Sequence, residues 1–156
     1  MKKLATFLVL CTLSVFAITQ KPETYQYKGW NHVKTMVIYD KKHPLYEPFG
    51  GIHHVYANDK ALKTIKEKGK RKFPKGAIIA FLLYEHVESK GAYTEGRKKI
   101  EAFMVKDPER YRDTGGWGFF AYDGKGKSLV KDMKRDCFSC HAQVKAQDYV
   151  FSTYKE

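Results

Sequence analysis

The sequence predicts a single α+β domain, rich in β-strands and carrying a few short helices. Turn-forming residues recur along the whole chain, among them Gly50-Gly51, Gly115-Gly116 and Gly124, and short apolar runs lie between them. Hydrophobic residues make up 43% of the 156 residues and aromatic residues 15%, which is enough for one packed core. The same composition excludes an intrinsically disordered chain.

Four strands are predicted, at residues 52–57, 77–87, 99–105 and 117–122. The second contains the run AIIAFLLY, which is apolar almost throughout, so we expect both of its faces to be covered. Alternation along this strand places Phe81 on the same face as its apolar neighbours Ile79 and Leu83.

Three helical segments are predicted between and after these strands. Asn58-Asp59 is typical of a helix cap and predicts a short helix at 60–68, with Leu62 and Ile65 facing inward. Asp107-Pro108 predicts a further turn of helix. The stretch 128–147 is expected to be helical around its two cysteines.

Residues 1–17 have the pattern of an export signal peptide. Lys2 and Lys3 are followed by an uncharged apolar run, and Val15-Phe16-Ala17 offers a cleavage site. An uncleaved membrane anchor is the alternative, although the run is short for a span of roughly 20 residues. Lipoprotein processing at Cys11 is disfavoured because bulky Leu10 precedes it. We therefore expect a periplasmic protein whose domain, 25–156, has no stable membrane insertion after cleavage.

The chain is strongly basic, with 29 Lys and Arg against 17 Asp and Glu and a formal net charge of +12. The densest basic run is KTIKEKGKRKFPK, at 63–75. Nucleic acid is not expected as a partner, because an exported protein rarely meets it and no nucleic-acid-binding motif accompanies the charge. Such a field is better suited to steering an acidic redox partner protein.

The chemistry of the chain is concentrated in the segment CFSCH, at 137–141. It matches C-x-x-C-H, the pattern of covalent haem c attachment. Thiols at Cys137 and Cys140 lie on one helical turn, so both can add to the vinyl groups of one porphyrin, and His141 then becomes the axial ligand of the iron. The sequence therefore predicts one covalent haem c.

Two other readings of the cysteine pair fit less well. A structural zinc site needs four ligands, and the other histidine cluster, His53-His54, directs its side chains to opposite faces of a strand. A thioredoxin-like pair opens a helix early in a βαβ unit, whereas this pair lies near the C-terminus and is followed directly by His141.

The position of the motif bears on the sixth ligand of the iron. No methionine follows His141, so a sixth ligand would have to come from Met36, Met104, Met133 or a histidine upstream. Each of these methionines is more simply interpreted as a core or surface residue. The sequence therefore favours five-coordinate iron with an open distal face.

The chain resembles the cytochrome P460 family, including its cytochrome c′-beta branch. The resemblance covers roughly 27–154 and depends on four blocks in order: HVYAND, KFPKGAIIAFLL, GGWGFFAYDG and DCFSCHAQVKAQDYVFSTY. It implies an antiparallel sheet with helices, a homodimer, and one c haem with a proximal histidine.

The family has two functional branches, and one position separates them. The hydroxylamine-oxidising enzymes cross-link a strand lysine to the porphyrin, whereas the cytochromes c′-beta place phenylalanine over the iron and bind nitric oxide or carbon monoxide. In this chain Phe81 stands where the lysine would be, and Phe49 is the candidate for a second distal aromatic. His53 and Arg97 are possible polar neighbours of the pocket.

The resemblance therefore favours a gas-binding protein over an enzyme, because an apolar distal wall favours neutral diatomic ligands. Hydroxylamine or nitric oxide oxidation through a cross-linked haem is the alternative, and simple electron transfer is a third hypothesis that the basic charge permits.

Overall fold

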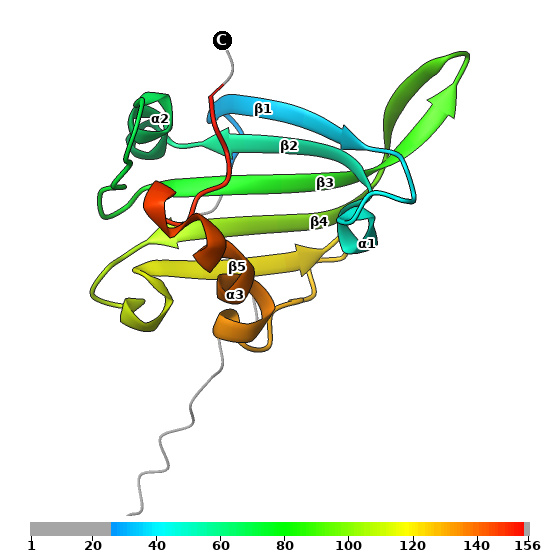
Figure 1. The fold of residues 1–156 in the computed structure, drawn as a ribbon. Coiled ribbons are helices and arrows are strands. Elements are labelled where there is room, and N and C mark those ends of the chain that lie inside the picture. The colour runs from blue at the N-terminus through cyan, green and yellow to red at the C-terminus, as the bar shows by residue number, and fades with distance from the viewer. Residues whose placement is uncertain (1–25, 155–156) are drawn as a thin grey trace, which may run out of the picture.

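The computed structural model describes residues 26–154; the predicted signal peptide, 1–17, lies outside the described residues. The strands, drawn in Figure 1, are β1 (Asn31–Ile38), β2 (Gly51–Ala57), β3 (Ile78–Ser89), β4 (Ala92–Lys106) and β5 (Trp117–Asp123). They form one five-stranded sheet in the order β1-β2-β3-β4-β5, and every neighbouring pair is antiparallel. The antiparallel α+β fold that the resemblance implied is confirmed.

The structure contains two strand segments that the sequence did not predict. β1 has only Val33 and Ile38 buried, so its apolar pattern is too sparse to stand out. The first half of β4 is largely exposed and rich in charge, and it pairs with the end of β3 in a long hairpin that projects from the sheet (Figure 1). Backbone pairing rather than burial makes these residues strand.

The helices before β3 are short and lie at the ends of the sheet. They are α1 (Tyr46–Phe49) and α2 (Asp59–Lys66). Asn58 caps α2 by accepting a hydrogen bond from the amide of Ala61 at 3.0 Å, as the sequence predicted. Ile65 is buried and Leu62 packs against the core.

The C-terminal helical segment is shorter than predicted. It consists of a π-helical turn (Lys134–Phe138), α3 (Ser139–His141) and a 3-10 turn (Ala142–Gln147), and another 3-10 turn (Arg112–Thr114) precedes β5. The helix does not begin at residue 128 because Asp132 forms its start: Oδ1 of Asp132 accepts from the amides of Lys134 and Arg135.

Both faces of β3 are covered, as its apolar run predicted, and two apolar clusters result. The larger lies under the C-terminal segment and includes Ile79, Trp117 and Phe119. The smaller lies on the opposite face around Ala80 and Phe103. Within residues 26–154, no helix is long and apolar enough to cross a membrane.

Candidate functional site

The Cys-x-x-Cys-His segment packs on the sheet face that carries the larger apolar cluster. The Phe138 ring lies 6.4 Å from that of Phe119 on β5 and 5.2 Å from that of Tyr149 (centroid distances). The first contact packs the turn on the sheet, and the second packs it on the segment that follows the C-terminal 3-10 turn. Cys137 is half-buried and Cys140 is exposed, and the two do not form a disulfide with each other.

The thiol of Cys137 is protonated at neutral pH. Burial, together with the neighbouring Asp136 carboxylate and the Cys140 thiol, raises the pKa of Cys137 to about 11. Since the thiolate is the form that binds metals, a metal ion at Cys137 would have to displace this proton. Among residues 26–154, no cluster of three or more His, Cys, Asp or Glu side chains could hold a metal ion.

His141 is held in one tautomer and one orientation. Its Nδ1 lies 2.7 Å from the carbonyl oxygen of Tyr149, and since a carbonyl only accepts, Nδ1 carries the proton. The ring lies between Phe119 and Phe151, at centroid distances of 4.9 Å and 5.2 Å, and burial lowers the pKa of His141. Nε2 is therefore left as an unprotonated donor atom for iron.

Three cross-strand rows of side chains line this face of the sheet. In order along the strands they are Ala57-Ile79-Met104-Phe119, Val55-Phe81-Ala102-Ala121 and His53-Leu83-Ile100-Asp123. Phe119 of the first row contacts the His141 ring. Phe81, in the second row, is displaced from Phe119 by one row along the strands and by two strands across the sheet. These displacements correspond to about 7 Å along the strands and about 10 Å across them.

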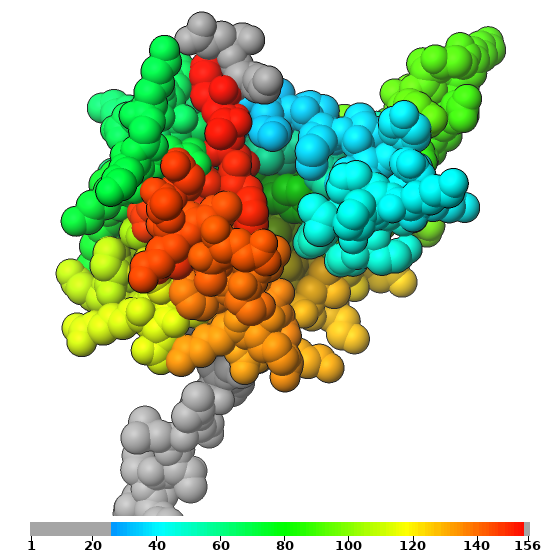
Figure 2. Space-filling model, in the orientation of Figure 1, coloured from blue at the N-terminus to red at the C-terminus, as the bar shows by residue number. Residues whose placement is uncertain are grey.

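On the β4 and β5 side of Phe81, the positions in its row carry only methyl groups. Ala102 and Ala121 are both half-buried, so the sheet between Phe81 and the C-terminal segment has low side chains. Figure 2 shows a recess at this place, with β3 visible between the C-terminal segment (orange to red) and the segment around α1 (cyan). A flat group can stand on the sheet there, so the residues present fit a porphyrin.

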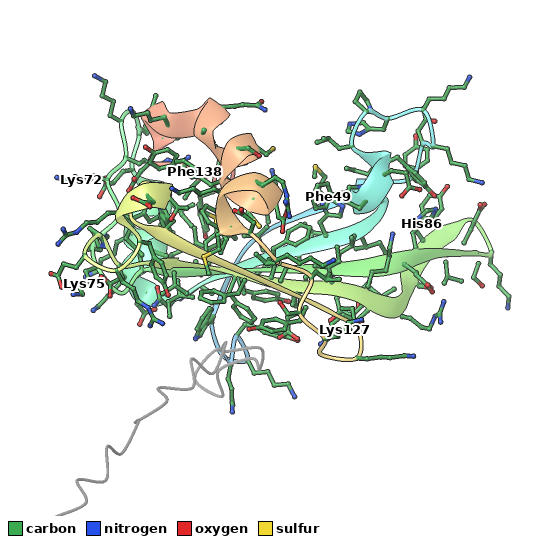
Figure 3. All side chains as sticks on the ribbon, turned by 90° about the horizontal axis from the view of Figure 1, so that it is seen from below. Phe49, Lys72, Lys75, His86, Lys127 and Phe138 are labelled. Atoms are coloured by element: carbon green, nitrogen blue, oxygen red, sulfur yellow. The ribbon has the colours of Figure 1, made fainter. Side chains whose placement is uncertain are left out.

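Phe49 and Phe81 come together on the far side of this recess. Their ring centroids are 6.1 Å apart with the planes at 90°, and the His53 ring lies 5.1 Å from Phe81. Figure 3 shows Phe49 on the α1 side of the sheet, facing the segment that carries Phe138. The predicted distal pair is thus one aromatic cluster.

Two side chains hold Phe49 in place by binding consecutive carbonyl groups. Nε2 of His53 donates to the Phe49 carbonyl, and Nζ of Lys99 donates to the Gly50 carbonyl at 2.8 Å. Burial lowers the pKa of His53, so this histidine is neutral at pH 7. Gly51 makes the close turn possible, since its φ is +139° and a Cβ would meet the Tyr84 carbonyl.

Other residues considered from the sequence lie elsewhere. The suggestion that Arg97 neighbours the pocket is wrong: it lies on the projecting hairpin and pairs with Glu85 at 2.7 Å. His54 faces the opposite side from His53 and contacts Thr35 and Glu95. Of the candidate methionines, Met104 and Met133 pack into the apolar cluster and Met36 is 42% exposed.

A Cys-x-x-Cys-His turn, a histidine with a free Nε2 and a facing aromatic cluster on an antiparallel sheet together define a haem protein. The comparison with known families agrees, because the model of the cytochrome P460 family matches residues 24–152. The chain belongs to the cytochrome P460 family, and this membership makes it a haem- and iron-binding protein. No curated protein matches the chain.

Sequence reasoning did not identify Lys99, Ala102 or Ala121 as site residues. Alternation along 99–105 could have placed Ala102 on one face of its strand, but not beside Phe81. That juxtaposition depends on the pairing of β3 with β4, which a single strand pattern does not contain.

Proposed function

We propose that this protein is a periplasmic monohaem c-type cytochrome that binds nitric oxide or carbon monoxide at five-coordinate iron. Cys137 and Cys140 are the thioether anchors and His141 is the proximal ligand through Nε2. The bound haem supplies an iron with one open coordination position. The protein chain positions His141 on one side of the haem and shapes the ligand pocket on the other side.

The observation that carries the proposal is the apolar character of the residues around Phe81. Its row partners are Val55, Ala102 and Ala121, and the Phe49 ring lies perpendicular to its ring. The His53 ring also lies beside it, but the Nε2 proton of His53 is bound to the Phe49 carbonyl. Such a wall donates no hydrogen bond to a bound ligand, so polar and anionic ligands gain nothing from it. Neutral diatomic molecules depend least on hydrogen bonds, so an apolar wall weakens their binding least. The aromatic rings also favour small ligands over large ones.

Oxidation of hydroxylamine is less well supported, because it needs a base close to the iron-bound nitrogen. The one carboxylate in the three rows is Asp123, whose Oδ1 accepts from the amides of Lys125 and Lys127, both at 2.9 Å. These hydrogen bonds hold the pKa of Asp123 below its usual range. His53 directs its Nε2 proton to the Phe49 carbonyl, and Phe81 stands where the cross-linking lysine is expected.

The absorption spectrum of the reduced protein, with and without carbon monoxide, tests the proposal. We expect a high-spin five-coordinate ferrous spectrum that shifts on addition of carbon monoxide, and an intact mass of chain plus one haem with no further bond. A low-spin spectrum unchanged by carbon monoxide would exclude gas binding at an open site. A strongly red-shifted ferrous band would instead support the cross-linked, hydroxylamine-oxidising alternative.

We also propose that an acidic redox partner docks on the basic segment formed by α2 and the loop after it. Its exposed lysines are Lys60, Lys63, Lys66, Lys68, Lys70, Lys72 and Lys75. The buried Arg71 ties this segment to the haem-bearing end of the chain, because its guanidinium donates to the carbonyls of Val150 and Ser152. Reduction by an acidic electron-transfer protein should slow steeply as salt rises, since the Debye length is about 10 Å at 0.1 M. A rate independent of ionic strength would remove this proposal.

Export and dimer formation complete the proposed function. Export is inferred from residues 1–17, and the homodimer from the family resemblance. The N-terminal residue of the mature protein in a periplasmic fraction, and its mass by sedimentation equilibrium, check these two points. An unprocessed chain in the membrane fraction would support the anchor alternative.

A further inference from the structure

The carbonyl that holds His141 is placed by an unusual backbone conformation. Asp148 and Tyr149 both have positive φ, at 50° and 67°. This region is uncommon for any residue but glycine, and it is a clear outlier for a bulky side chain such as tyrosine. Two consecutive residues of this kind reverse the chain directly after the 3-10 turn and direct the Tyr149 carbonyl at Nδ1 of His141.

A buried ion pair holds this reversal on the sheet. Nζ of Lys106, at the end of β4, lies 2.7 Å from Oδ1 of Asp148, and the two side chains are 6% and 12% exposed. The other carboxylate oxygen of Asp148 accepts from the amide of Phe73 at 2.8 Å. The Asp148 carbonyl accepts from Nε1 of Trp117, also at 2.8 Å. Three separate parts of the domain therefore meet at Asp148.

The surroundings of Tyr149 leave it little freedom to move. Its ring packs so closely on Gly115 that a Cβ there would lie 2.3 Å from the ring. Nζ of Lys106 also donates to the Gly115 carbonyl at 3.1 Å, so one lysine binds both sides of this contact. Uncommon backbone conformations persist where the surrounding structure holds them, and they cluster at functional sites.

We propose that the Lys106–Asp148 pair positions the proximal ligand: it keeps the Tyr149 carbonyl on Nδ1 of His141 and so sets how strongly Nε2 donates to iron. Neither residue touches the iron or the ligand, so both are positioning residues. When the ring nitrogen that does not bind the metal donates a strong hydrogen bond, the nitrogen that does bind the metal becomes more basic. A stronger donor favours ferric over ferrous iron. This inference rests on the proposed role of His141 as the iron ligand.

The test compares the haem-loaded protein with its Asp148→Asn variant and with the double variant Lys106→Met/Asp148→Asn. The single variant leaves the buried Lys106 ammonium unpaired and can fail to fold, whereas the double variant leaves no unpaired buried charge. The double variant also removes one charge of each sign, so the direct field of the pair at the iron changes little. What remains is the effect of the released Tyr149 carbonyl.

We expect the ferric–ferrous equilibrium of the double variant to shift toward ferrous iron by about three- to tenfold, where tenfold is 59 mV for a one-electron couple. The iron–histidine stretching frequency of the ferrous protein should fall as well. Arg97→Met, which removes an exposed arginine paired with Glu85, is the control for loss of an ion pair. Ile65→Ala, in the same apolar cluster but in α2, is the control for loss of stability. Both controls should keep the parental potential and frequency.

The inference would be overturned if the double variant folds, binds haem and keeps the parental potential and stretching frequency. An equal shift in Ile65→Ala would also overturn it, because the effect would then follow general stability. A parent protein that shows no iron–histidine stretch would contradict the proposed function itself, and the two failures are thereby distinguishable.

Discussion

Replacing both Cys137 and Cys140 with alanine is expected to release the haem completely into acidified acetone, whereas the parent protein should release none. Two thioether bonds are the only covalent links that the proposed attachment contains. The intact mass of the double variant under denaturing conditions should fall to that of the bare chain. Because Phe138 still packs the segment on Phe119 and Tyr149 when both thiols are gone, the sheet itself should still form.

The single variants sharpen this result. Cys137→Ala and Cys140→Ala should each keep haem through the remaining thioether, and each should leave one vinyl group on the porphyrin, which the spectrum of the pyridine complex detects. Because Cys137 is half-buried in the apolar cluster and Cys140 is exposed, the first change should cost more stability. Haem that stays bound after acid extraction of the double variant would mean that another side chain is cross-linked to it.

Phe81→Ala is expected to accelerate carbon monoxide binding to the ferrous protein. If the ring has to move aside for the ligand to enter, its removal lowers the barrier by about 1–2 kcal/mol, which is roughly a five- to thirtyfold increase in rate. Flash photolysis or stopped-flow mixing measures this rate. Since Phe81 is only half-buried, the loss of stability should be smaller than the ~3–5 kcal/mol typical of a fully buried phenylalanine.

Phe120→Ala is the matched control for Phe81→Ala. Phe120 is also half-buried, but it packs with the smaller apolar cluster on the opposite face of the sheet. The control should lose comparable stability and keep the parental binding rate. Equal rates in the parent and Phe81→Ala would show that Phe81 is a core residue with no role in ligand entry.

Much of the fold follows from short-range patterns. The apolar run in β3 indicated a strand covered on both faces, and Asn58 indicated the start of α2, because burial and capping act over a few residues. β1 and the first half of β4 escaped prediction because their residues are mostly exposed. Such strands exist through pairing with a neighbour, and no pattern within the strand records which neighbour that is.

In the candidate site, too, some features follow from neighbouring residues in the sequence and others only from tertiary contacts. The spacing of Cys137, Cys140 and His141 is local, so the chain alone specifies their shared chemistry, and alternation alone puts Phe81 on an apolar strand face. The tertiary structure decides what surrounds them. Lys99 reaches the Gly50 carbonyl across 49 residues of chain, and Lys106 reaches Asp148 across 42. A lone lysine has no sequence signature for such a contact, because its meaning depends on the partner that folding brings within reach and on the water that burial removes.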